Sequence, residues 1–184
     1  MARAPRLQVA GGLFHVTTRS PARRPILPDD DARAICLRLV ERACARYGWS
    51  CHSYCVMTTH YHLLVTTAEP NLSRGMQWLN GLYGTIFNHE YASNGHVFGA
   101  RFASVHVISD AHLLRTVSYI AMNPVGAGLC ARPSDWRFSS YSALIGRRRS
   151  GFLELDSILR LFAFDRAEAR RRIEEFVWPA DVTA

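Results

Sequence analysis

Two hydrophobic periodicities alternate along this chain of 184 residues, and their order strongly limits the fold that it can adopt. Segments in which apolar and β-branched residues alternate with polar ones predict strands, whereas apolar residues three or four positions apart predict helices. The predicted strands cover residues 13–18, 49–57, 60–67 and 102–108. The predicted helices cover residues 29–48, 71–91 and 109–123, with two shorter ones at 154–163 and 166–177.

The resulting order of strand, helix, strand, strand, helix, strand is typical of the ferredoxin-like, split β-α-β arrangement. We therefore expect an α+β protein with an antiparallel sheet and helices on one face, followed by a third helix and a short helical tail. Pro124 is expected to stop the third helix. The pattern predicts one domain at residues 1–146 and a helical C-terminal extension at 147–184, with the three arginines at 147–149 as a hinge.

Two histidines one residue apart, His60 and His62, open the third predicted strand. Side chains two apart on a strand point to the same face, so both imidazoles would project together while Tyr61 points to the other side. Such a pair can hold one metal ion from a rigid platform. The alternative is an ordinary pair of surface histidines, and the pattern alone does not separate the two.

The third predicted helix carries a tyrosine away from its apolar stripe. At 100° per residue, Tyr119 lies nearly opposite the stripe, and Asn123 and Arg115, one turn to either side, share its face. The alternative is a tyrosine that packs on another element or is simply exposed. A tyrosine hydroxyl can attack phosphorus, and a divalent metal would assist it. With the Asn123 amide as a third ligand, two imidazoles would suit Mn²⁺ or Mg²⁺ in an open site.

The five cysteines predict no disulfide framework, because their number is odd and nothing marks the chain as secreted. Cys36 and Cys44 fall on the apolar stripe of the first helix and are expected in the core. Cys51 and Cys55 precede the histidine pair, but their spacing does not fit a structural zinc module.

Composition points to a basic protein without membrane spans. No apolar run reaches the length of a span, and the first residues lack the apolar stretch of a secretory signal, so we expect a cytoplasmic protein. The net charge is +7, and all 22 basic residues are arginine. A GC-rich genome explains the missing lysine, but guanidinium groups also bind phosphate oxygens well. The positive charge favours a polyanionic partner.

Five segments in order carry a resemblance to a known family. They are Val56–Val65 with the histidine pair, Leu79–Asn88, Gly95–Phe102, Tyr119–Leu129 and Asp135–Tyr141. With these segments the chain resembles the IS200/IS605-type single-tyrosine HUH transposases, and most closely their REP-associated tyrosine branch. The similarity runs from about residue 14 to residue 141.

The resemblance implies a role for each matching residue. Tyr119 would be the nucleophile, and His60, His62 and Asn123 would hold a divalent Mg²⁺ or Mn²⁺. The implied reaction is cleavage of single-stranded DNA beside a REP-like hairpin, which leaves a 5′-phosphotyrosine link and a free 3′-hydroxyl. The candidates for contacts to the DNA backbone are Arg19, Arg74, Arg101 and Arg115.

Other functions stay open at the level of sequence. A domesticated relative could bind hairpin DNA without cutting it, although the presence of Tyr119 and both histidines speaks against that. An unrelated metal hydrolase would use the histidines but would not explain Tyr119 and Asn123 on one face. The family contains monomers as well as homodimers in which one subunit's tyrosine helix serves the other's histidines, so either state is compatible with the sequence.

Overall fold

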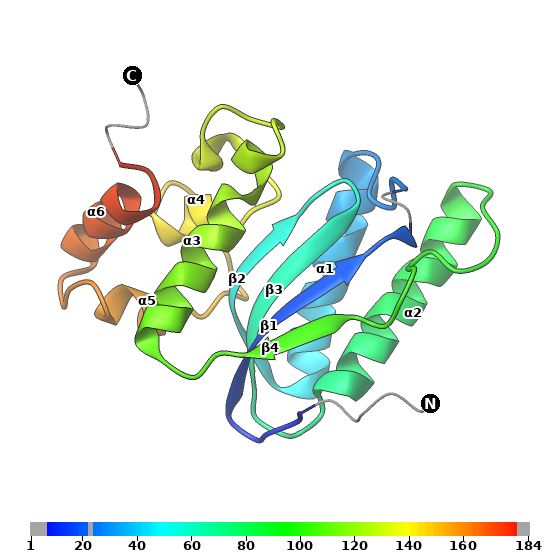
Figure 1. Cartoon of the computed structure of the whole chain (residues 1–184), viewed down its shortest axis with the longest axis horizontal. Helices are drawn as coiled ribbons and strands as arrows, with labels where there is room; N and C mark the ends of the chain where they lie inside the picture. Colours follow the sequence, from blue (N-terminus) through cyan, green and yellow to red (C-terminus); the bar gives the residue numbers. More distant parts are fainter. Residues whose placement is uncertain (1–6, 22–23, 180–184) are drawn as a thin grey trace.

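The computed structural model describes residues 7–21 and 24–179, and its centre is a four-stranded antiparallel sheet (Figure 1). The strands are β1 (Gly12–Arg19), β2 (Trp49–Val56), β3 (His60–Thr67) and β4 (Ala103–His106), in the order β2-β3-β1-β4. All neighbouring strands pair antiparallel. This order confirms the split β-α-β arrangement, because the helix between β1 and β2 crosses over β3, and the helix between β3 and β4 crosses over β1.

The long helices are α1 (Asp30–Tyr47), α2 (Leu72–Glu90) and α3 (Asp110–Gly126). A short 3₁₀ turn (Pro133–Asp135) and three smaller helices follow, namely α4 (Tyr141–Leu144), α5 (Asp156–Arg160) and α6 (Arg166–Val177). Sequence periodicity predicted α6 to the residue, but it missed α4 and gave α5 too long, because one-turn helices carry too few apolar positions to show a period.

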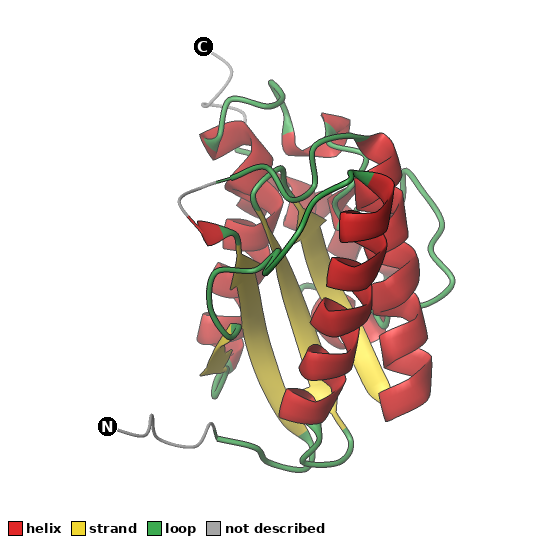
Figure 2. Ribbon diagram, turned by 90° about the vertical axis from the view of Figure 1, so that its right-hand side faces the viewer, coloured by secondary structure: helices red, strands yellow, loops and turns green. Residues whose placement is uncertain are grey.

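The sheet separates two hydrophobic cores, and Figure 2 shows helices on both of its sides. The first core lies between the sheet and helices α1 and α2, and it includes Phe14, Tyr61 and Leu79. The second core lies on the other face, where α3 to α6 pack, and it includes Leu64, Ile120 and Ile173. Helix α3 therefore lies against the second face of the sheet, the face that Tyr61 does not point to.

The predicted stop of the third helix at Pro124 is wrong. The helix continues to Gly126, with the buried Pro124 inside it, and the N–H of Ala127 still donates to the carbonyl of Asn123. Proline removes only its own donor, to the carbonyl of Ile120, so one lost hydrogen bond near the helix end does not prevent another turn.

Other helix ends agree with the sequence. Asp29 caps α1 through its side chain, Gly48 ends that helix in the left-handed conformation with φ of 65°, and Ser109 caps α3. Over residues 7–21 and 24–179, no helix is both long and apolar enough to cross a membrane.

Candidate active site

The histidine pair lies where the strand pattern predicted it. His60 and His62 project from β3 to the α3 side of the sheet, and Tyr61 between them is buried in the first core. The centroids of the two imidazole rings are 5.0 Å apart. His62 is almost fully buried, with 1% of its surface exposed, whereas His60 is partly exposed at the beginning of the strand.

Helix α3 brings Tyr119 and Asn123 to this pair. Its apolar side, which includes Val117 and Ile120, is buried in the second core and fixes the rotation of the helix. The ring of Tyr119 is half-exposed, at 49%, and its centroid lies 5.4 Å from that of His62. The Asn123 Oδ1 lies 3.3 Å from Nε2 of His60, while its Nδ2 donates to the carbonyl of Tyr119. Residues distant in sequence therefore face one another.

Burial keeps both imidazoles neutral. Desolvation lowers the pKa of His62 to about 3, with smaller contributions from His15, His60 and Arg19. Desolvation also lowers the pKa of His60, and the nearby Arg19 contributes in the same direction. A neutral imidazole is the form that binds metal ions.

The free nitrogen of His62 points to a ligand. Its Nδ1 lies 3.1 Å from Oγ1 of Thr17 and 3.0 Å from Nε2 of His15. In the tautomer that carries the proton on Nδ1, these two groups can accept it, and Nε2 keeps its lone pair. This Nε2 is buried and has no hydrogen-bond partner in the described residues. A buried acceptor without a partner is costly, and a metal ion would satisfy it.

A divalent cation fits the donor atoms that meet here. They are Nε2 of His60, Nε2 of His62 and Oδ1 of Asn123, two imidazole nitrogens and one amide oxygen. No group of three or more His, Cys, Asp or Glu side chains within residues 7–21 and 24–179 could hold a metal ion. The set is therefore complete only with the amide of Asn123, which is compatible with an open site for Mg²⁺ or Mn²⁺.

Sequence reasoning missed two residues on β1. Thr17 pairs with His62 across the β1–β3 ladder, and His15 Nε2 lies 3.0 Å from Nδ1 of His62. The ring centroid of His15 is also 5.9 Å from that of Tyr119. Alternation does place His15 and Thr17 on one strand face, but only the pairing of β1 with β3 aligns that face with His62.

The four arginines proposed for DNA contacts do not gather at one place. Arg19 is exposed, pairs with His60 in the β-ladder and lies at the site, and Arg115 is exposed on α3 one turn before Tyr119. Arg101 instead lines a cavity between α2 and the loop before β4. Arg74 lies near the beginning of α2, beyond the opposite end of β3 from His60.

The arginines of the tail are largely engaged with acidic neighbours. Arg171 pairs with Glu168 and Glu175, and Arg172 also pairs with Glu168. Arg147 pairs with Glu174 of α6, and Arg148 donates to backbone carbonyls of the body. These pairs favour a solvated helix face over a phosphate-binding one.

The cysteines do not form a zinc site with the histidines. Cys51 belongs to the first core and Cys55 to the second, so their side chains lie on opposite faces of the sheet. Cys36 and Cys44 are buried in the first core as predicted, and all five cysteines are free.

Comparison with known proteins identifies the family of this chain and a similar fold. A family model described as "Transposase IS200 like" matches residues 8–123. The fold is similar to that of a REP-associated tyrosine transposase solved with a bound REP hairpin, with a TM-score of 0.68 and 19% identity over 84% of this chain and 95% of that one. A candidate transposase from Deinococcus radiodurans R1 gives a TM-score of 0.45 and 16% identity over 65% and 94% of the two chains. Among curated proteins, none matches the chain.

Proposed function

The chain belongs to the family of IS200-like transposases, and on this premise we propose that it cuts and rejoins single-stranded DNA beside a hairpin, with Tyr119 as the nucleophile. The observation that carries the proposal is the position of the Tyr119 ring against His62, with Asn123 of the same helix at His60. The similar fold solved with a REP hairpin supports a REP-like hairpin as the DNA element, and thus the REP-associated branch.

In the proposed reaction, the Tyr119 Oη forms a bond to a DNA phosphorus and loses its proton to solvent. The bond between phosphorus and the 3′ oxygen breaks, and that oxygen leaves as a 3′-hydroxyl after taking up a proton. The DNA keeps a 5′-phosphotyrosine link. Because one phosphoester replaces another, a later attack by a 3′-hydroxyl releases Tyr119 and rejoins DNA without a nucleotide cofactor.

The residues that would hold a divalent cation are His60, His62 and Asn123. Bound there, Mg²⁺ or Mn²⁺ would supply Lewis-acid polarisation of the scissile phosphate. The protein's own contribution is to keep the imidazoles neutral through burial and to orient His62 through Thr17. The Nδ2 of Asn123 donates to the carbonyl of Tyr119, which orients the amide so that its Oδ1 faces His60.

One copy of the chain contains every group in this proposal. Tyr119 lies beside the histidines of its own chain. We therefore infer that a monomer suffices for cleavage, with the tyrosine acting in cis, and that a homodimer is not required. An enzyme that acts on chromosomal DNA of this kind would work in the cytoplasm.

The test is covalent capture of the DNA. The protein is incubated with single-stranded hairpin oligonucleotides and Mn²⁺, and a protein–DNA adduct is sought on a denaturing gel. Wild type and the control Tyr47→Phe should form the adduct, since Tyr47 is remote from the histidines and keeps its ring. Tyr119→Phe should form none.

Two outcomes would contradict the proposal in different ways. If wild type binds hairpins but forms no adduct with any of them, the chain is a non-cleaving hairpin-binding protein. If Tyr119→Phe still forms the adduct, the nucleophile is another residue.

A further inference from the structure

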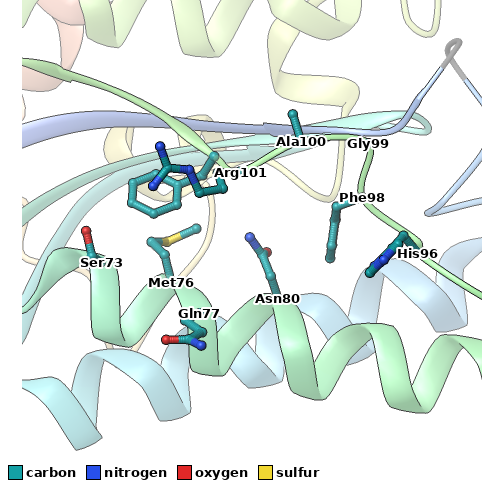
Figure 3. A pocket seen from close by; sticks show the side chains of 10 residues that line it. Ser73, Met76, Gln77, Asn80, His96, Phe98, Gly99, Ala100 and Arg101 are labelled. Carbon is teal, nitrogen blue, oxygen red and sulfur yellow. The ribbon is translucent and has the colours of Figure 1, made fainter. Parts of the chain in front are cut away.

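A second pocket lies on the sheet side opposite the histidines. It is a cavity of ≈ 620 Å³ between helix α2 and the loop that leads into β4 (Figure 3). Its volume is several times that of one nucleobase. Met76 and Phe102, at its base, belong to the first core, so the cavity is built on a rigid floor. Nothing in the proposed cleavage reaction uses it.

Asn80 presents a fixed hydrogen-bond donor in this cavity. The hydroxyl of Tyr61 donates to Oδ1 of Asn80, and the Tyr61 ring is buried in the first core. This bond sets the orientation of the amide and leaves the Nδ2 hydrogens, for which no partner occurs among the described residues. The free side of Asn80 can therefore donate but not accept.

An aromatic ring and a guanidinium group line the cavity beside Asn80. Figure 3 shows Asn80 rising from α2 toward the loop and Phe98 descending from the loop toward the helix. The Phe98 ring packs on Tyr61 and Tyr83, with centroid distances of 6.4 and 5.8 Å. Arg101 is exposed at the same cavity and forms no ion pair within the described part of the chain.

We propose that this cavity binds one unpaired nucleobase of the substrate DNA, which stacks on Phe98 and presents acceptor atoms to Asn80, with Arg101 at the adjoining phosphate or base edge. Aromatic faces hold bases of single strands, and amide and guanidinium donors recognise base edges. The Asn80 amide and the Arg101 guanidinium are donors, and such donors favour a base edge made of acceptors, as the N7 and O6 edge of guanine is. This inference rests on the proposed function, which identifies the ligand as single-stranded substrate DNA.

A backbone hydrogen bond links the loop of the cavity to the end of β1 that lies beside His60. The N–H of Gly99, next to Phe98, donates to the carbonyl of Arg19 at 3.3 Å, and Arg19 pairs with His60. A DNA strand that passes the His60 end of the sheet would thus meet Arg19 first and then the loop that carries Phe98. Glycine is needed at position 99, because a Cβ there would come within 2.8 Å of the Pro21 backbone.

The test measures binding alone, in the Tyr119→Phe background and without divalent metal. Each unpaired nucleotide of a hairpin oligonucleotide is replaced in turn by an abasic site, and Kd is measured by fluorescence anisotropy. At one position the abasic site should weaken binding about tenfold. In the added variant Phe98→Ala that position should lose its effect, while thermal melting confirms the fold.

A base-preference experiment uses a matched pair of variants. Asn80→Asp keeps the oxygen that accepts from Tyr61 but replaces the donor, so guanine at the sensitive position should lose its advantage over adenine and cytosine. Asn94→Asp makes the same change on an exposed residue that does not line the cavity, in the loop that carries Phe98, and it should leave the preference unaltered.

The outcomes separate this inference from the proposed cleavage. If abasic sites act equally in Phe98→Ala and its parent at every position, the cavity holds no base and the inference fails. If the base-dependent effects appear but wild type forms no covalent adduct, the cavity stands and the cleavage proposal fails. If Asn80→Asp and Asn94→Asp show the same preference for guanine at the sensitive position, Asn80 does not recognise the base.

Discussion

A hydroxyl on β1 contacts the most buried imidazole of the candidate site. Thr17 Oγ1 lies 3.1 Å from Nδ1 of His62, where it can accept the Nδ1 proton and hold the ring with its unpartnered Nε2 available to a metal ion. Partners of this kind orient metal ligands, and their loss typically weakens metal binding by about 10- to 100-fold. We expect Thr17→Val to raise the Kd for Mn²⁺ by this factor, as measured by calorimetric titration.

The chain offers a matched control for Thr17→Val. Thr66 makes the same type of contact to a histidine, His52 Nε2 at 2.8 Å, at the other end of the sheet. Thr66→Val should leave the Mn²⁺ affinity unchanged. An equal loss of affinity in both variants would mean that Thr17 acts through general stability and not through His62.

Two glycines of α2 have opposite environments at the scale of the element. A Cβ on Gly75 would come within 2.2 Å of the Trp49 ring, whereas a Cβ on Gly81 meets nothing within 4 Å. We expect Gly75→Ala to lower the free energy of unfolding by about 1–3 kcal/mol through overpacking. Gly81→Ala should raise it by about 0.5–1 kcal/mol, because alanine favours the helix. Urea denaturation measures both, and equal signs would contradict the predicted packing.

The N-cap of α1 links stability to pH. The backbone N–H of Ala32 and the hydroxyl of Tyr91 both donate to the Asp29 carboxylate and lower its pKa below the usual 3.8. The charged cap therefore stabilises the fold above that pH, and its contribution is lost as pH falls through the lower, folded-state pKa.

The corresponding variant is Asp29→Ala. It should cost about 1 kcal/mol of unfolding free energy at pH 7, and the difference from wild type should shrink below pH 3. Asp31→Ala, in the same turn but without the capping contact, should change stability by less than about 0.5 kcal/mol. Urea denaturation at both pH values measures this, and a difference that persists unchanged at pH 2.5 would contradict the role of the charge.

At the scale of the whole molecule, the C-terminal tail shares a core with the tyrosine helix. Ile173 of α6 is fully buried in the second core together with Val117 and Ile120 of α3. We propose that the extension 147–184, of which residues 180–184 lie outside the described part, supports the position of α3. The division into a domain of residues 1–146 and an extension stays a prediction. Residues 1–6 of that domain lie outside the described part of the chain.

Ile173→Ala tests this support. It should lower the free energy of unfolding by about 2–5 kcal/mol, and it should weaken adduct formation at temperatures well below melting, because α3 carries Tyr119. The control is Ile108→Ala, an exposed isoleucine at 78%, which should change stability by less than about 0.5 kcal/mol. Normal adduct formation in a destabilised Ile173→Ala would show that the tail does not position α3.

The sequence by itself determined the elements and their faces. Alternation put His60 and His62 on one side of a strand and Tyr61 on the other, and helical periodicity turned Tyr119 and Asn123 away from the apolar stripe of α3. These are local consequences of backbone geometry, with periods of 2 and 3.6 residues, so they can be inferred without knowledge of any distant contact.

Only the tertiary structure decided which faces meet. The pairing of β1 with β3 placed Thr17 and His15 at His62, and the second core brought Asn123 to His60. It also moved Arg74 away from the site and formed the cavity beside Asn80. Strand register and helix docking depend on the packing of many side chains distant in sequence, and no local period encodes that choice.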